Sequence, residues 1–159
     1  MQIEPFETAQ AYGFPCVRQF SVFIENRVGT LLRLTKVFEA TDVHILALSV
    51  IDSVDCSIIR TIVDNPDEAY RVMAQAGFPV VESELAVVSL PPGKRALLHV
   101  LTALMSGEIN VHYTYPLLVQ PMGRPALAIA ADNLETAVEV MKEKGLTVLD
   151  QSDLTLDQS

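Results

Sequence analysis

Apolar residues alternate with polar ones along residues 18–24, which is the period of a strand with one buried face. In residues 31–38 the apolar positions recur at three and four residues, which predicts an amphipathic helix of about three turns. Residues 43–51 and 57–63 are rich in β-branched side chains. They flank the polar residues 52–55, so the pattern predicts two strands joined by a hairpin turn.

A second helix is marked at both ends. Asn65 is placed as its N-cap, Pro66 occupies the first helical position, and Glu68 follows three residues after the cap. Gly77 stands where the left-handed residue that ends a helix belongs. A short strand over residues 80–82 then completes the order strand, helix, strand, strand, helix, strand.

The chain repeats this unit. Residues 30–45 align with residues 96–111, and residues 64–80 align with residues 132–148 with Asp, Asn, Ala, Val, Met, Gly and Val in register. The spacing of the two blocks differs by two residues, which a hairpin turn between them can absorb. In the second copy Asn133 and Gly145 take the places of the N-cap and the helix-ending glycine, so the chain is a duplication.

The order of elements predicts an α+β chain of two tandem ferredoxin-like βαββαβ modules, each an antiparallel sheet with both helices on one face. We expect an N-terminal extension over residues 1–16, a first module over residues 17–85 and a second over residues 86–159. A core of this size is marginal and bare sheet edges invite pairing, so the two modules should dock side by side, edge to edge. Residues 83–90 contain no Gly or Pro, which indicates a tight junction.

Composition narrows the class of protein. Half of the 159 residues are hydrophobic and the formal net charge is -9, with no cluster of Lys or Arg. Such a surface repels nucleic-acid phosphates and anionic lipids, so we expect neither as a partner. Residues 1–15 resemble no signal peptide and no apolar run is long enough to span a membrane, which favours a cytoplasmic protein. Cys16 and Cys56 form no metal or disulfide pattern and are expected to be reduced thiols.

Catalytic patterns are missing from the sequence. It contains no dinucleotide fingerprint, no phosphate-binding loop, no nucleophile elbow and no zinc-protease motif. The histidines His44, His99 and His112 fall in different predicted elements, and no spacing predicts a metal site. We therefore expect no enzyme activity, no catalytic residue and no cofactor or metal.

One segment is a candidate for ligand binding, the corner between the first strand and the first helix. Gly29 lets the backbone approach a guest closely, and the helix that follows presents unpaired N–H groups to an anion. The carboxylate of an amino acid suits such a place. The alternative is structural: Asn26 caps the helix and Gly29 eases a tight turn.

The run Ile-Glu-Asn-Arg-Val-Gly-Thr-Leu at residues 24–31, the run Asp-Val-His-Ile at residues 42–45 and the repeated order of elements resemble the ACT domain, a small-molecule sensing module of amino-acid metabolism. The resemblance spans residue 17 to the C-terminus. In the family the first loop reads Asn-x-Pro-Gly-x-Leu, and Asn26, Gly29 and Leu31 match it, whereas Val28 replaces the proline. The resemblance thus implies that the ligand-binding residues are Asn26, Arg27, Val28, Gly29, Thr30 and Leu31.

The second copy departs further from the family pattern. In residues 91–97 Arg95 stands where the family has its glycine, so its pocket should be weaker, although an arginine attracts an anion. In serine-binding members an Asn early in the second strand of one module reaches the ligand of its neighbour. Asn110 matches this position, whereas the first copy carries His44. The resemblance therefore implies one pocket completed by Asn110 and a second, weaker one with His44 and Arg95.

The function that the resemblance implies is regulatory. We expect a protein that binds a free amino acid or a similar metabolite between modules, forms a homodimer and signals to a biosynthetic enzyme. Acetolactate synthase is one possible enzyme, because its regulatory subunit also uses an ACT module. The alternative is an assembly module whose ligand pocket has decayed.

Overall fold

The computed structural model describes residues 13–25 and 27–155. The first repeat folds as predicted into strand, helix, two strands, helix and strand. Its elements are β1 (Val17–Ile24), α1 (Thr30–Lys36), β2 (Ile45–Asp52), β3 (Ser57–Val63), α2 (Pro66–Gln75) and β4 (Val80–Ser89). The second repeat adds α3 (Ala96–Ser106), β5 (Val111–Pro116), the 3-10 turn η2 (Pro121–Gly123), β6 (Ala126–Ala131), α4 (Leu134–Glu143), β7 (Thr147–Leu149) and the 3-10 turn η3 (Gln151–Leu154).

The two repeats share the strand β4. Its residues from Val80 to Leu85 pair with β1, and its residues from Ala86 to Ser89 pair with β6, all antiparallel. Strand β7 pairs with the same second half of β4. The strand orders are therefore β2-β3-β1-β4 and β5-β6-β4-β7, which confirms two ferredoxin-like modules in tandem.

The sharing of β4 was not predicted from the sequence. We expected a strand over residues 80–82 only, but β4 continues to Ser89. The residues from Leu85 to Val88 are all fully buried, because helices or the other sheet cover each face of the strand there. A strand buried on both faces shows no polar alternation, so its periodicity gives no signal.

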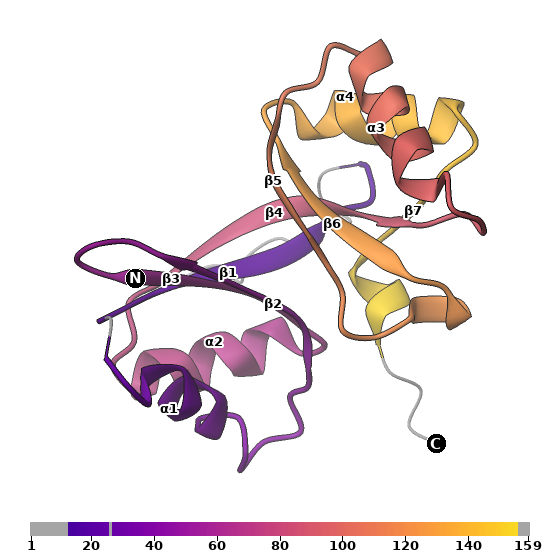
Figure 1. The fold of residues 1–159 in the computed structure, drawn as a ribbon. Helices are drawn as coiled ribbons and strands as arrows, with labels where there is room; N and C mark the ends of the chain where they lie inside the picture. Colours follow the sequence, from indigo (N-terminus) through magenta and orange to yellow (C-terminus); the bar gives the residue numbers. More distant parts are fainter. Residues whose placement is uncertain (1–12, 26, 156–159) are drawn as a thin grey trace.

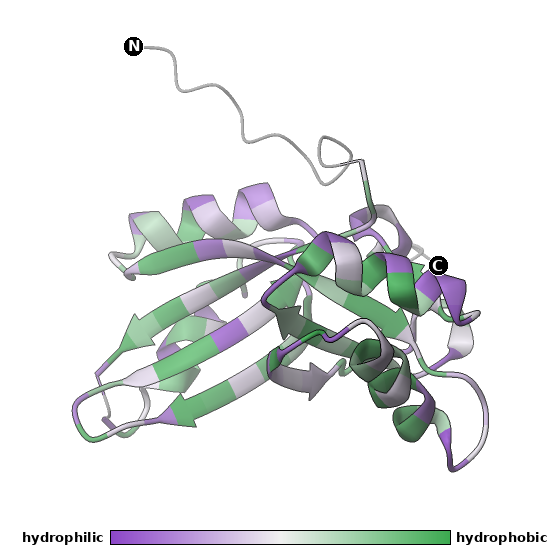
Figure 2. Ribbon diagram, turned by 90° about the horizontal axis from the view of Figure 1, so that it is seen from above, coloured by the Kyte–Doolittle hydropathy of each residue, from purple (hydrophilic) through white to green (hydrophobic). Residues whose placement is uncertain are grey.

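The helices lie on the two outer sides of the molecule, and the helix-free faces of the sheets pack on each other (Figure 1). Apolar residues run along the strands of both sheets (Figure 2). One core lies under α1 and α2, a second lies under α3 and α4, and a third lies between the sheets. The third core contains Val17, Leu85, Tyr115 and Ala128, so the modules are held face to face as well as through β4.

The outer edges of the two sheets also meet. Ala47 of β2 forms a bridge to Leu117, and the N–H of Leu118 donates to the carbonyl oxygen of Leu46 at 2.7 Å. The combined sheet is therefore curled, with β2 and β5 brought together at one point.

The predicted helix ends of the second helix in each repeat are confirmed. The side chains of Asn65 and Asn133 accept hydrogen bonds from main-chain N–H groups three residues later, at 3.3 and 3.1 Å. Gly77 and Gly145 follow the two helices with φ of +84° and +81°. The first helix is shorter than predicted and ends at Lys36, because the next N–H groups bond to carbonyls three residues back in a tighter turn.

A buried polar network joins the modules. The Gln19 side chain of β1 receives a hydrogen bond from the Tyr115 hydroxyl at 2.5 Å. Its amide donates to Tyr113 Oη at 2.7 Å and to Ser83 Oγ at 3.1 Å. Burial raises the pKa of the Tyr115 hydroxyl well above its ordinary value, so this group stays a donor at any physiological pH.

Candidate functional site

The corner between β1 and α1 is exposed. Gly29 has φ of +85°, and a Cβ atom built on it would meet nothing within 4 Å. The hydroxyl of Thr30 donates to the carbonyl oxygen of Arg27 at 3.0 Å, and Arg27 pairs with Glu25 at 2.8 Å. Val28 is fully exposed. Asn26, the first residue of the predicted motif, lies outside the described residues, and Leu31 is also partly exposed.

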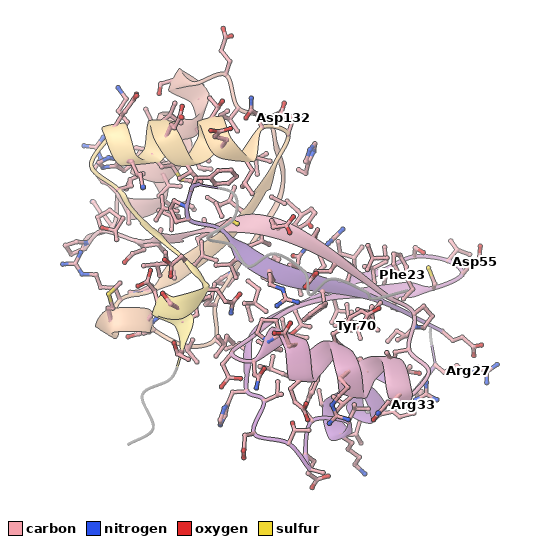
Figure 3. The ribbon with its side chains drawn as sticks, turned by 180° about the vertical axis from the view of Figure 1, so that it is seen from behind. Phe23, Arg27, Arg33, Asp55, Tyr70 and Asp132 are labelled. Carbon is pink, nitrogen blue, oxygen red and sulfur yellow. The ribbon has the colours of Figure 1, made fainter. Side chains whose placement is uncertain are left out.

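Asn110 is not close to this corner within one chain. Its side chain is exposed, and its main-chain N–H and C=O bond to Asp132 at 3.2 and 3.1 Å. Figure 3 shows Asp132 and Arg27 at opposite ends of the molecule. Figure 1 likewise separates the start of β5 from the start of α1. A pocket with both Gly29 and Asn110 therefore needs a second copy of the chain.

His44 is held by its own module. Its Nδ1 lies 2.7 Å from Asp64 Oδ2, and its main-chain N–H donates to Asp64 Oδ1 at 2.7 Å. The pair of Asn110 and Asp132 repeats this main-chain arrangement in the second module. In each module the aspartate after β3 or β6 thus holds the residue just before the neighbouring strand. The two pairs occupy equivalent positions of the repeat, and their main-chain bonds are structural.

The corner between β4 and α3 contains a pocket of about 450 Å³. Arg95 lines it and is the N-cap residue of α3. His99 and Lys144 also line it, and an imidazole nitrogen of His99 lies 3.2 Å from the carbonyl oxygen of Lys144. The remaining walls are small, hydroxyl-bearing or apolar residues, including Pro91 and Leu98. No acidic side chain is among its lining residues, so the pocket favours an anion. His44 does not line it.

A larger hollow of about 860 Å³ lies at the seam of the modules. Its lining includes Asp64, Lys142 and Asp150. The two acids already have partners: Asp64 pairs with His44, and Asp150 caps η3. Hydrogen bonding from Ser152 holds the pKa of Asp150 below its ordinary value. The mixed charge and these structural roles give no clear preference for a ligand.

A comparison of the two repeats could have identified a second basic residue of the Arg95 pocket, which the sequence prediction did not include. Lys144 occupies the position of Ala76 in the first module, just as Arg95 occupies that of Gly29. The second module has thus gained two cations at positions that are uncharged in the first. Lys144 was missed because it falls at a helix end, where a lysine is common for electrostatic reasons alone.

Other kinds of site are not found in the part of the chain that the structure describes. Within residues 13–25 and 27–155, no group of three or more His, Cys, Asp or Glu side chains is placed to hold a metal ion. Over the same residues, no helix has the length and apolar character needed to cross a membrane.

Comparison with known proteins agrees with the fold. A family model described as the ACT domain pair matches residues 15–156. Protein BT0572 from Bacteroides thetaiotaomicron is 30% identical, with a TM-score of 0.81 over 89% of this chain and 97% of that one. No curated protein matches the chain.

Two regulatory subunits of aspartate kinase share the fold at low identity. The subunit from Thermus thermophilus, in its ligand-free form, is 12% identical with a TM-score of 0.57 over 82% of this chain and 93% of that one. The subunit from Thermus flavus is 13% identical with a TM-score of 0.54 over 83% and 94%.

Proposed function

Because the chain belongs to the ACT domain pair family, we propose that it is a non-catalytic regulatory protein that binds a free amino acid or a similar small carboxylate. The observation that carries this proposal is the pocket at Arg95, with its three basic residues and no acid. For this proposal the modules are residues 17–85 and 86–159, preceded by an N-terminal extension over residues 1–16.

The pocket has the size and chemistry for such a ligand. A volume of about 450 Å³ lies within the range of small-molecule sites. The guanidinium of Arg95 offers the forked geometry that matches a carboxylate, and the start of α3 supplies main-chain N–H groups beside it. Leu98 and Pro91 provide an apolar wall for the rest of the molecule. These features support the Arg95 pocket as a binding site for the proposed ligand.

The first module contributes a second site when two copies associate. Gly29 and its neighbours form an open corner, and Asp132, which bonds to Asn110, lies at the opposite end of the molecule from Arg27. A homodimer that brings Asn110 of one copy to the loop at residues 27–31 of the other would complete the predicted pocket. Binding across such an interface links the ligand to the assembly state.

The output of the protein is contact with another protein, an enzyme of amino-acid metabolism in the cytoplasm. A ligand shifts the equilibrium between two arrangements only by its differential affinity for them, commonly about 1 to 3 kcal/mol. Such a coupling changes the affinity for a partner enzyme by roughly 5- to 150-fold. A binding module needs no catalytic residue for this role.

A thermal-shift screen against the twenty amino acids and their 2-oxo acids tests the proposal. We expect one compound to raise the melting temperature, because a ligand that binds only the folded chain stabilises it by mass action. Arg95→Gln should abolish the shift. Arg124→Gln, at the exposed arginine that follows η2, is the matched control and should keep the shift. A chain that responds to none of these compounds would not be such a sensor.

A second pair of variants separates the two sites. Gly29→Asp places a charge and a side chain at the open corner, whereas Gly29→Asn has nearly the same size and backbone strain without the charge. If the first corner binds a carboxylate, the Asp variant loses more affinity than the Asn variant. Equal responses of both variants and the native chain would assign binding to the Arg95 pocket alone.

One observation favours the alternative, an assembly module. Helix α3 carries no charged residue, and it exposes Leu97, Leu98, Leu101 and Met105. Large apolar side chains exposed together on one helix are typical of a surface that another protein covers. Leu101→Glu, at an exposed position of α3 outside the Arg95 pocket, should convert the assembly to monomers in sedimentation velocity. A ligand response that survives in the monomer would separate sensing from assembly.

A further inference from the structure

Arg60 of β3 is the least satisfied polar side chain in the part of the chain that the structure describes. Its Nε and Nη1 atoms are buried, and no hydrogen-bond acceptor is close to either. The third nitrogen, Nη2, is not one of these buried atoms without a partner. A buried guanidinium nitrogen without an acceptor costs free energy, since water no longer solvates it. This cost calls for an acceptor that the chain itself does not supply.

The strand register places Arg60 on the helix-free face of the first sheet. Ser49 of β2 and Ser21 of β1 are its direct neighbours in the adjacent strands. Residues directly opposite in antiparallel strands point to the same side, so both serine side chains lie on the same face of the sheet as Arg60. Val81 of β4 lies beyond Ser21 in the same row. No acidic residue occupies this row.

The next row toward the hairpin end is apolar. It contains Ile51, Ile58 and Phe23, paired in that order across β2, β3 and β1. Phe23 and Ile51 are about two-fifths exposed, and Val81 is about half exposed. Figure 3 shows Phe23 on the face of the sheet that lies opposite α2. The open part of this face thus combines one cation, two hydroxyls and an apolar floor.

The other module closes the inner end of this face. The Arg60 guanidinium carbon lies 3.8 Å from the centroid of the Tyr113 ring of β5, a cation–π contact. Tyr113 in turn bonds to Gln19, which holds Tyr115. Any anion that binds Arg60 therefore acts on the polar network that joins the two modules.

We infer that the helix-free face of the first sheet binds a small aliphatic carboxylate, with the carboxylate on Arg60 and the aliphatic tail on the row of Phe23 and Ile58. The Nε–Nη2 edge of a guanidinium accepts a carboxylate in two parallel hydrogen bonds. In the described conformation Nη2 is the nitrogen that can donate to the carboxylate, and a turn of the side chain away from the Tyr113 ring is needed to bring the buried Nε to it as well. The site shares no residue with the Arg95 pocket or the loop at residues 27–31.

The dimensions favour a small molecule over a second copy of the chain. Adjacent strands lie about 4.8 Å apart, and two residues along a strand span about 6.7 Å. The spacing between the row of Arg60 and the row of Phe23 and Ile58 therefore fits an acid of roughly four to six carbons. Phe23, Ile51 and Val81 are only partly exposed, whereas a stable protein interface buries roughly 800 Å² on each partner.

The test is a titration of the full chain with 4-methylpentanoate, followed by the NMR signal of the Arg60 Nε–H group. We expect this signal to move downfield at saturation, because the N–H gains a charged acceptor. Acetate, which lacks the tail, should bind at least tenfold more weakly, and so should the neutral 4-methylpentanamide. Phe23→Ser should lower the affinity for 4-methylpentanoate but leave the weak binding of acetate unchanged.

Variants at the arginine provide the decisive comparison. Arg60→Met should lower the affinity for 4-methylpentanoate at least tenfold. Arg60→Lys should bind with intermediate affinity, because lysine keeps the positive charge but lacks the forked guanidinium. Arg124→Met is the control and should bind as the native chain does. Far-UV circular dichroism checks that each variant is folded, and Arg60→Lys carries the test if Arg60→Met is not.

Three results would overturn the inference. The first is equal binding of 4-methylpentanoate and 4-methylpentanamide. The second is equal binding of 4-methylpentanoate by Arg60→Lys and by the native chain. Alternatively, the Arg60 signal could respond to protein concentration and not to the acid, which would assign the face to a second copy. Gly29→Asp and Arg95→Gln should leave this titration unchanged, so failure here and failure of the proposed function are distinguishable.

Discussion

Removal of the Tyr115 hydroxyl tests whether the modules are held face to face. Tyr115→Phe keeps the ring in the inter-sheet core but leaves Gln19 Oε1 without its donor at 2.5 Å. Gln19 is fully buried, so water cannot replace the donor. An unsatisfied buried acceptor costs about 1–3 kcal/mol. We therefore expect a loss of about 2 kcal/mol in the free energy of unfolding, equivalent to roughly 4–8 °C in a domain of this size.

Tyr113→Phe provides an internal comparison. It removes one acceptor of the Gln19 amide, which keeps its second bond to Ser83 Oγ at 3.1 Å. Tyr113 is also partly exposed. The cost should therefore be smaller, about 0.5–1.5 kcal/mol. Combining Tyr115→Phe with Gln19→Leu should restore part of the loss, because both partners of the buried bond then become apolar.

Urea unfolding followed by far-UV circular dichroism measures these values. A shared strand and a common core predict one cooperative transition for both modules. The reasoning would be refuted by Tyr115→Phe and Tyr113→Phe losing equal amounts, or by a loss below about 0.5 kcal/mol, the level of an ordinary surface change. Two separate transitions, with only one of them sensitive to Tyr115, would show that the modules unfold independently.

Three further changes probe local features. Asn133→Ala should cost about 1 kcal/mol in urea unfolding, because it removes the N-cap of α4. Gly107→Ala puts a Cβ atom 2.7 Å from Val140 Cγ1 and should cost about 1–3 kcal/mol, most of which Val140→Ala in the same chain should restore. Burial, and to a smaller extent the nearby acids, raises the pKa of Cys16 to about 11, so its thiol stays protonated at pH 8. Iodoacetamide should then add one label to the native chain, at Cys56, and two labels in urea, as counted by intact mass.

Local signals in the sequence were sufficient for most of the fold. Asn65 and Asn133 have a side-chain oxygen that can satisfy a helix N–H, and both do so. Gly77 and Gly145 adopt the left-handed conformation that their positions predicted. These features depend on residues within one turn of each other, so the sequence carries them directly.

The arrangement of the modules depends on contacts that no local pattern encodes. Strand β4 serves both modules because Leu85 to Val88 are covered on both faces, which erases the alternation that marks a strand. The same docking separates Arg27 from Asp132, the partner of Asn110, and leaves Arg60 beside Tyr113. Arg60 looked like an ordinary polar position of an alternating strand, and only the register of three strands and the second module give it a distinct environment.

The shared strand also limits how a bound ligand can act. A hinge between modules needs a few residues that can change φ and ψ freely, but β4 crosses the junction with main-chain bonds to β1 on one side and to β6 on the other. The bridge from Ala47 of β2 to Leu117, just after β5, ties the modules at a second point, and the network at Gln19 ties them at a third. Opening of the seam would break all three links together, at a cost well above the about 1–3 kcal/mol that a ligand commonly supplies. Under the proposed function, a ligand signal would therefore be carried by surface elements such as α3 and by the side chains around Tyr113. Small displacements there change the surface that a partner contacts, while the two modules keep one relative orientation.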